Sequence, residues 1–227
     1  MSAAADFFSM PDNYLEKDYN VTVRRKLVAE LVGEVSGKKI LDIGCGDGRV
    51  SLHFALDNDL TLVDASPEML ELVRTNTPDE VSHQVTPILS TLEDAPLKEG
   101  NFDLIIAMGI MAHLSSWKNG IAILAKSVKT GGQVIIQISD SANPMVRSQL
   151  KPTGKRLHAL NQIDFSSLVE TCTQFGLTLR TEKRYGFTVR GMGKLPNRFL
   201  YQFTLATARL RLLRKITTEV IAVFQKV

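Results

Sequence analysis

Hydrophobic positions along the chain change their spacing repeatedly, and these changes predict alternating helices and strands. Residues 21–35 carry apolar side chains at the spacing of an amphipathic helix, namely Val23, Leu27, Leu31 and Val35. Seven shorter, largely apolar runs predict strands. They cover residues 39–43, 60–63, 81–89, 102–108, 133–138, 177–185 and 218–224. The fourth run is apolar almost throughout, which is typical of a central parallel strand covered on both faces.

Helix start and stop signals separate these strands. Ser66 is suited to cap a helix that begins with Pro67, and Asp164 or Ser166 to cap one that Gly176 ends. Further helices are predicted over residues 49–56, 117–128 and 195–215, and the glycine pair 131–132 predicts a turn into the fifth strand. Strands that alternate with helices indicate parallel βαβ units. The predicted fold is a doubly wound, Rossmann-like α/β domain: a seven-stranded, mostly parallel sheet with a late antiparallel strand and an inserted helix before it.

Composition and charge fit a single domain spanning residues 1–227. Of the 227 residues, 44% are hydrophobic and 22% are charged, which is enough apolar material for one substantial core. Only two cysteines are present and no apolar run approaches the ~20 residues that cross a bilayer, so we expect a cytoplasmic protein. Residues 180–227 hold eleven Lys or Arg and two Glu. This basic C-terminal region indicates an acidic partner, peripheral contact with an anionic membrane surface, or only a solvated basic face.

A glycine-rich turn, in the stretch ILDIGCGDGR, joins the first predicted strand to the next helix. Gly44, Gly46 and Gly48 allow a tight turn and let a ligand approach bare backbone. A dinucleotide site would have the spacing G-x-G-x-x-G, but here Arg49 occupies the place of the third glycine. Asp42, one turn earlier, would repel a pyrophosphate and attract a cationic amino-acid group. The turn therefore favours a nucleoside ligand that carries a positive charge.

Asp64 closes the second predicted strand, about 20 residues after the glycine turn, where an acidic side chain can accept hydrogen bonds from two ribose hydroxyls. With these residues together, the chain resembles the class I S-adenosylmethionine (SAM)-dependent methyltransferase family. The resemblance rests on LDIGCGDGR at 41–49, LVDASPEML at 62–70, FDLII at 102–106 and VKTGGQV at 128–134. The first of these motifs is specific, and the later ones support it.

The resemblance implies a set of SAM-binding residues. Asp42, Gly44, Gly46 and Gly48 would surround the methionine part and Asp64 the ribose. The residues implied for the rest of the cofactor site are Ala65, Met69, Thr91, Leu92, Glu93 and Ala107. Thr91 stands where relatives often carry an acid for the adenine amino group, so either Thr91 accepts this hydrogen bond or Glu93 or Asp94 replaces it. The Leu92 backbone N–H would donate a hydrogen bond to the adenine ring, and its side chain would cover the ring.

SAM supplies its own electrophilic methyl group, so the protein chiefly has to align an acceptor. A base is required only when that acceptor loses a proton. Two histidines near the predicted carboxyl edge of the sheet are candidate bases, His113 and His158, and a structural hydrogen bond or a solvated loop position is the alternative for each. No zinc spacing and no acidic cluster for magnesium is visible, so no metal is expected.

The fourth strand ends without the Asn/Asp-Pro-Pro-aromatic signature of relatives that methylate nucleic-acid amines, so no nucleic-acid partner is expected. The predicted reaction is in-line methyl transfer from SAM to an oxygen or nitrogen of a small molecule. Two alternatives stay open: C-methylation of a lipid-like or quinone-like acceptor, and a SAM-binding module without catalysis. A nicotinamide-dependent oxidoreductase would need the other glycine spacing.

Three segments are expected on the substrate side. Residues 1–35 would supply a lid and helix, residues 139–163 a loop, and residues 187–215 a loop with the inserted helix. Candidate acceptor contacts in and near these segments are Tyr14, Tyr19, Met111, Phe199 and Phe203. In the inserted helix the two phenylalanines lie on an apolar stripe. The stripe would form a wall over the acceptor, dock on a membrane, or belong to a helix packed on the body.

Overall fold

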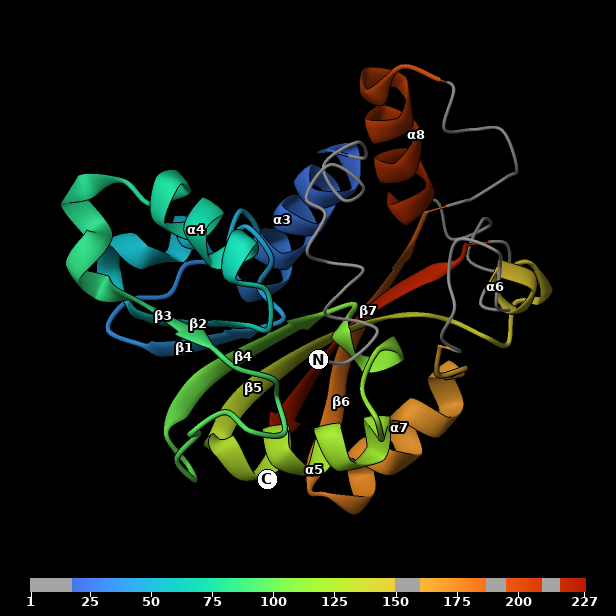
Figure 1. The fold of residues 1–227 in the computed structure, drawn as a ribbon. Helices are drawn as coiled ribbons and strands as arrows, with labels where there is room; N and C mark the ends of the chain where they lie inside the picture. The colour runs from blue at the N-terminus through green and yellow to red at the C-terminus, as the bar shows by residue number, and fades with distance from the viewer. Residues whose placement is uncertain (1–17, 150–159, 187–194, 210–216) are drawn as a thin grey trace.

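The computed structural model describes residues 18–149, 160–186, 195–209 and 217–227. Their centre is a seven-stranded sheet with the strand order β3-β2-β1-β4-β5-β7-β6 (Figure 1). The strands are β1 (Lys39–Ile43), β2 (Asp59–Asp64), β3 (Val85–Leu89), β4 (Phe102–Met108), β5 (Val128–Ser139), β6 (Leu177–Tyr185) and β7 (Glu219–Lys226). Strands β1 to β5 pair in parallel, whereas β7 is antiparallel to both β5 and β6. This confirms the predicted fold class.

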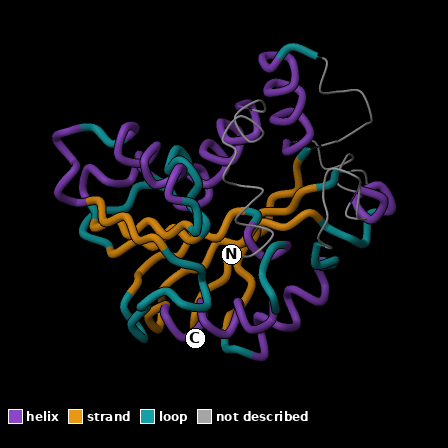
Figure 2. Tube along the Cα trace, in the orientation of Figure 1, coloured by secondary structure: helices purple, strands orange, loops and turns teal. Residues whose placement is uncertain are grey.

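Helices cover both faces of the sheet (Figures 1 and 2). On one face lie α3 (Asp18–Val32), α4 (Pro67–Asn76), α8 (Asn197–Arg209) and the 3₁₀ helices η1 (Leu52–Asp57) and η2 (Asp79–Gln84). On the other face lie α5 (Trp117–Ser127) and α7 (Phe165–Gln174). Two smaller elements follow β4 and β5, namely η3 (Ile110–Ala112) and α6 (Pro144–Gln149). No helix within the described ranges combines the length and the apolarity that crossing a membrane requires.

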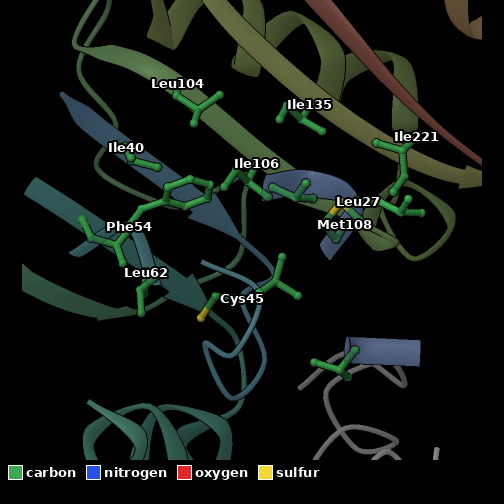
Figure 3. Packing of buried hydrophobic residues seen from close by; sticks show 14 of the residues in the cluster. Leu27, Ile40, Cys45, Phe54, Leu62, Leu104, Ile106, Met108, Ile135 and Ile221 are labelled. Atoms are coloured by element: carbon green, nitrogen blue, oxygen red, sulfur yellow. The ribbon is translucent and has the colours of Figure 1, made fainter. Parts of the chain in front are cut away.

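Alternating strand residues feed two separate cores. Ile40 and Ile106 point to the face covered by α3, where Leu27 and Phe54 join them (Figure 3). Their neighbours in sequence, such as Leu41, pack on the opposite face against α5 and α7. Successive strand side chains point to opposite faces, so a strand buried on both sides must be apolar at nearly every position. The near-continuous apolar run in β4 has this cause.

The predicted helix caps are confirmed in part. Ser66 caps α4, since its Oγ accepts a hydrogen bond from the Met69 N–H at 3.2 Å. Asp164, rather than Ser166, caps α7 by accepting from the Ser167 N–H at 2.9 Å. Hydrogen bonds from Ser166 and Ser167 lower the pKa of Asp164 to about 2, so the cap stays ionised at neutral pH. Gly176 follows this helix with φ of +74°, as the stop signal required.

Three local predictions were wrong. The helix expected over residues 49–56 is the 3₁₀ helix η1, and the Asp47 carboxylate accepts the Arg49 N–H just before it. Such local hydrogen bonds compete with the α-helical pattern. Residues 79–84 form η2, so the third strand begins at Val85. The glycine pair 131–132 lies inside β5, where a Cβ on Gly132 would come within 3.0 Å of the Asp103 carbonyl oxygen.

Candidate cofactor and acceptor site

The glycine turn lies at the carboxyl end of β1 and is tied to β2. Gly44, Gly46 and Gly48 all have positive φ, at +68°, +56° and +77°, which residues with a Cβ rarely adopt. The Gly44 N–H donates to the Val63 carbonyl at 2.8 Å, and the Gly46 N–H donates to Asp64 Oδ2 at 2.8 Å. The turn thus presents bare backbone beside the carboxylate that ends the neighbouring strand.

Asp42 lies beneath this turn and is almost fully buried. Its Oδ2 accepts a hydrogen bond from Ser51 Oγ at 2.6 Å. Burial raises the pKa of Asp42 to about 7, the Ser51 hydrogen bond opposes this, and the nearby Asp64 and Asp47 charges add to it. A cationic group placed against this site would therefore be attracted to a carboxylate that is costly to ionise by itself.

Asp64 is only partly buried, and both of its oxygens are already anchored. Oδ2 accepts from Gly46 N–H, and Oδ1 accepts from Ser66 N–H at 2.9 Å. Desolvation raises the pKa of the Asp64 carboxyl, and backbone hydrogen bonds from Ser66, Gly46 and Ala65 oppose the shift. A carboxylate offers about four lone-pair positions. The two backbone donors therefore fix its orientation and leave capacity for two hydroxyl donors.

The stretch after β3 holds the expected adenine-side residues. Thr91 is exposed and its Oγ1 donates to Asp94 Oδ2 at 2.9 Å, while the Asp94 N–H donates back to Thr91 Oγ1 at 3.2 Å. Glu93 is also exposed and accepts from Ser115 Oγ at 3.0 Å. The Leu92 side chain is buried in the core on the α5 face. Its side chain therefore supports this stretch from below, and Thr91 and Glu93 supply the polar groups at the surface.

A second region of the same sheet edge contains a cavity of about 150 Å³. It lies where β4 and β5 end, under the residues that follow them. The lining residues are Arg24, Gly109, Ala112, His113, Gln137, Ile138, Ser139, Leu160, Asn161 and Ile163. Asn161 closes one side by donating from Nδ2 to the Leu114 and Met111 carbonyls, at 2.8 and 3.1 Å. The cavity therefore has an apolar wall and a polar end.

The polar end is organised around Glu219, the first residue of β7. Its carboxylate accepts from Gln137 Nε2 and from Ser139 Oγ, the latter at 2.9 Å to Oε1 and 3.0 Å to Oε2. Burial raises the pKa of Glu219, whereas the Arg24 charge and the hydrogen bonds from Ser139, Thr218 and Gln137 lower it. This buried carboxylate thus has both a nearby cation and several hydrogen-bond donors.

A family model described as a methyltransferase domain matches residues 40–132, which span β1 to the glycines of β5. The same stretch contains the glycine turn, Asp42 and Asp64. This match over residues 40–132 supports the resemblance to class I SAM-dependent methyltransferases.

Curated relatives and solved structures resemble the chain to different extents. Over 114 residues the chain is 32% identical to the ubiquinone biosynthesis O-methyltransferase of Photobacterium profundum, an alignment that covers 49% of this chain and 48% of that one. The chain thus spans about half the length of the curated relatives it matches. A SAM-dependent methyltransferase structure from Thermotoga maritima superposes with a TM-score of 0.68 at 17% identity, covering 97% of this chain and 98% of that chain. Magnesium protoporphyrin IX methyltransferase from Synechocystis, solved with bound S-adenosylhomocysteine, gives 0.62 at 16%, covering 92% and 84%. At these identities the two structures show the shared fold.

The methyltransferase domain places the predicted cofactor residues unevenly. Asp42, the three glycines and Asp64 meet at one point of the sheet edge, with Ala65 exposed beside them. Met69 and Ala107 are fully buried core residues. Groups of three or more His, Cys, Asp or Glu side chains that could hold a metal ion do not occur among the described residues.

The predicted acceptor residues are also divided. His113 lines the cavity, and Tyr19, on α3, is half-buried with a pKa raised mainly by burial and also by the Glu219 charge. Met111 is fully buried in the core, away from the cavity wall. His158 and Tyr14 lie outside the described residues.

The inserted helix α8 turns a different face to the body from the predicted apolar stripe. Leu200 and Leu205 are buried, and the Thr207 hydroxyl accepts from Gly186 N–H at 3.2 Å. Phe199 is 55% exposed, and its ring stacks on Phe203 with centroids 6.2 Å apart. No described residue of α8 lines the cavity. Phe199 and Phe203 thus lie outside this cavity, and their contact with the acceptor stays a prediction.

Sequence reasoning missed the residues that form the polar end of the cavity. Arg24, Gly109, Gln137 and Ser139 line the cavity, and Glu219 lies behind Gln137 and Ser139. One signal was present, because Gln137 is a polar residue inside the apolar run of β5. A buried polar side chain in a central strand requires a partner, and the partner, Glu219, lies 82 positions away in the sequence.

Proposed function

We propose that this protein transfers the methyl group of SAM to an oxygen or nitrogen of a small-molecule acceptor by in-line displacement. The observation that supports the proposal most is the pairing of two sites on one sheet edge. Asp64 and the glycine turn form one, and the cavity at the ends of β4 and β5 forms the other. Ligands of open α/β sheets bind at this edge. A cofactor at the first site would direct its reactive end towards the second.

The residues of the first site fit SAM. Asp64 is held by two backbone donors and keeps lone pairs for two ribose hydroxyls. The glycines leave backbone bare where the methionine part would lie. The buried Asp42 carboxylate, which lies beneath the glycine turn, would attract the ammonium group of the methionine part. Thr91 or Glu93 would accept from the adenine amino group, and the Leu92 backbone would flank the ring.

When bound, SAM supplies an electrophilic methyl group with a good leaving group. The chain's own work is then to hold the acceptor in line and to exclude water, which can lower a barrier by ~7–11 kcal/mol. His113 lies on the cavity wall, where it would take a proton from an acceptor hydroxyl or serve as a hydrogen-bonding wall residue. The segments 1–35, 139–163 and 187–215 would frame the acceptor side, with Tyr19 of the first close to Glu219.

An oxygen acceptor is favoured by two curated relatives, which are named ubiquinone biosynthesis O-methyltransferase in Photobacterium profundum and magnesium-protoporphyrin O-methyltransferase in Rhodobacter capsulatus. They act in the biosynthesis of ubiquinone and on magnesium protoporphyrin, as their names state. A small molecule is therefore the acceptor class we propose. Fold alone does not choose between O-, N- and C-methylation.

Methyl-labelled SAM incubated with fractionated cell extract tests this function. The wild-type protein should label one small-molecule fraction, and identification of the product names the acceptor. Asp64→Ala should label that fraction much more slowly, whereas Asp59→Ala, at the exposed opposite end of the same strand, should act as wild type. Tight SAM binding without label in any fraction would instead support a SAM-binding module.

A further inference from the structure

The Gln137 side chain forms part of the cavity wall and is only 1% exposed. Its Nε2 donates to Glu219 Oε2. Its Oε1 is buried and accepts no hydrogen bond from the part of the chain that the structure describes. A buried acceptor without a donor is costly, so most such groups in proteins are satisfied by protein, water or ligand. The amide nitrogen of Gln137 is therefore hydrogen-bonded, whereas its oxygen lacks a hydrogen-bond donor.

Glu219 determines the orientation of the Gln137 side-chain amide. The Glu219 carboxylate accepts from the NH₂ group of Gln137, so that group faces the carboxylate and the amide oxygen points away from it. Ser139 Oγ donates to the same carboxylate, at 2.9 and 3.0 Å, which holds Glu219 in place from a second side. The orientation of Oε1 is thus imposed by residues behind the cavity wall.

Oε1 points towards Gly109, the residue that follows β4. A Cβ built on Gly109 would lie 3.2 Å from Oε1, and 3.7 and 3.8 Å from the two terminal guanidinium nitrogens of Arg24. Three wall residues therefore converge on one point, and Gly109 has no side chain there to fill it. We name this point, bounded by Gly109, Gln137 and Arg24, the polar corner.

The charges at the polar corner offset each other. Burial raises the pKa of the Glu219 carboxyl, and the Arg24 cation opposes this rise, so neither charge is left to select an ion. The group that fits best is a neutral one with a hydrogen to donate. The cavity volume of about 150 Å³ matches that of an engineered apolar cavity known to bind benzene, so a six-membered ring fits.

We infer that the polar corner recognises a neutral O–H or N–H group on the methyl acceptor, with Gln137 Oε1 accepting its hydrogen bond. Glu219 is the positioning residue, because it acts on the acceptor only through the orientation of the Gln137 amide. The inference rests on the proposed function, since it takes the cavity to be the acceptor site of a methyltransferase.

A pair of matched small molecules tests the inference without any methyl transfer. Phenol and toluene have nearly the same shape, but only phenol can donate. Their binding to the full chain would be measured by ligand-observed NMR, with and without saturating S-adenosylhomocysteine. The wild-type protein should prefer phenol about tenfold, the scale of one net hydrogen bond. Equal affinities in the wild-type protein would overturn the inference.

Variants separate recognition from stability. Gln137→Met keeps the length of the side chain and should reduce the phenol preference to less than twofold, with unchanged affinity for S-adenosylhomocysteine. Gln225→Met makes the same change on β7, where Gln225 pairs with the opposite end of β5, and should keep the full preference. A preference that survives in folded Gln137→Met would contradict the role of Oε1.

Glu219→Gln tests the positioning role and is a second route if Gln137→Met does not fold. An amide at position 219 no longer dictates the orientation of Gln137, so the phenol preference should fall to about threefold. An unchanged tenfold preference would overturn the positioning role. Failure of S-adenosylhomocysteine to bind, with the phenol preference intact, would count against the proposed function alone.

Discussion

The two parts of the carboxyl sheet edge are built in different ways. The cofactor part, at the ends of β1 and β2, comes from two short stretches, 41–49 and 64–70, whose residues contact one another across a single parallel pair. The acceptor part joins α3, β4, β5 and β7. Arg24 of α3 lines the cavity together with Gln137 of β5, and its charge acts on Glu219 of β7. A local motif encodes the first part, whereas long-range packing assembles the second. On the proposed function, the first would bind the cofactor and the second would be free to vary with the acceptor.

The largest expected effect comes from the cofactor part, in Gly46→Val. Gly46 has φ of +56° and donates its N–H to Asp64, so a β-branched residue would distort the turn and occupy ligand space. SAM affinity should fall by roughly 100-fold or more, about 3 kcal/mol. Isothermal titration calorimetry measures it. Gly37→Val is the matched control, because Gly37 has φ of +65° with no atom within 4 Å of an added Cβ. Equal SAM affinity in both variants would mean that the turn has been misread.

The next effect is a pH dependence that belongs to Asp42. Its folded pKa, about 7, lies above the ordinary value of 3.8, so the stability linked to this group is present at low pH and is lost as the pH rises towards 7. The ammonium group of SAM favours the ionised carboxylate. SAM affinity should therefore rise with pH, by roughly tenfold between pH 5 and 7.

Asp42→Asn isolates this component, because an amide oxygen can still accept from Ser51 Oγ. Calorimetry across the pH range should give a flatter affinity profile for the variant, and thermal melts should show a smaller loss of stability between pH 4 and 7. Parallel profiles for the wild type and the variant would place the titrating group elsewhere, with Asp64 the next candidate since its pKa is also raised.

The smallest effect is expected from the acceptor part, in the double variant Phe199→Ala/Phe203→Ala. The two rings stack on one another and Phe199 is 55% exposed, so their loss should change the melting temperature little. If α8 covers the acceptor, KM for the acceptor identified by labelling should rise a few-fold with SAM affinity unchanged. Leu200→Ala, in the buried face, is the contrast and should destabilise the fold.

A rise in KM that only follows a fall in melting temperature would mean that α8 serves to stabilise the fold and does not contact the acceptor. Co-sedimentation with anionic vesicles, lost in the double variant, would instead support a peripheral membrane surface at the basic C-terminal region.

The same contrast explains how much the sequence could predict. Period and capping signals act over a few residues, so β1, β4, β6 and the Ser66 cap were placed correctly. The prediction of an α-helix over residues 49–56 was wrong because the Asp47 and Ser51 side chains form local hydrogen bonds around the glycine turn. Gly132 lies inside β5, where the Asp103 backbone comes too close to leave room for a side chain. In the sequence, the glycine pair 131–132 has the pattern of a turn.

The acceptor part could not be predicted for a related reason. Gln137 and Glu219 each look like an ordinary strand residue, and only the antiparallel pairing of β5 with β7 brings them together. Arg24 comes from a helix more than a hundred positions earlier in the chain. The nature of the cavity therefore depends on tertiary contacts that no short motif records.

The most direct measurement of the central claim is the affinity of SAM for wild-type, Asp64→Ala and Asp59→Ala proteins by isothermal titration calorimetry at pH 7.5. The two carboxylates lie at opposite ends of β2, and only Asp64 faces the glycine turn. We predict that Asp64→Ala weakens SAM binding by roughly 1.5–3 kcal/mol, the scale of hydrogen bonds to a charged group, and that Asp59→Ala binds as wild type does. Unchanged SAM affinity in a folded Asp64→Ala protein would contradict the account.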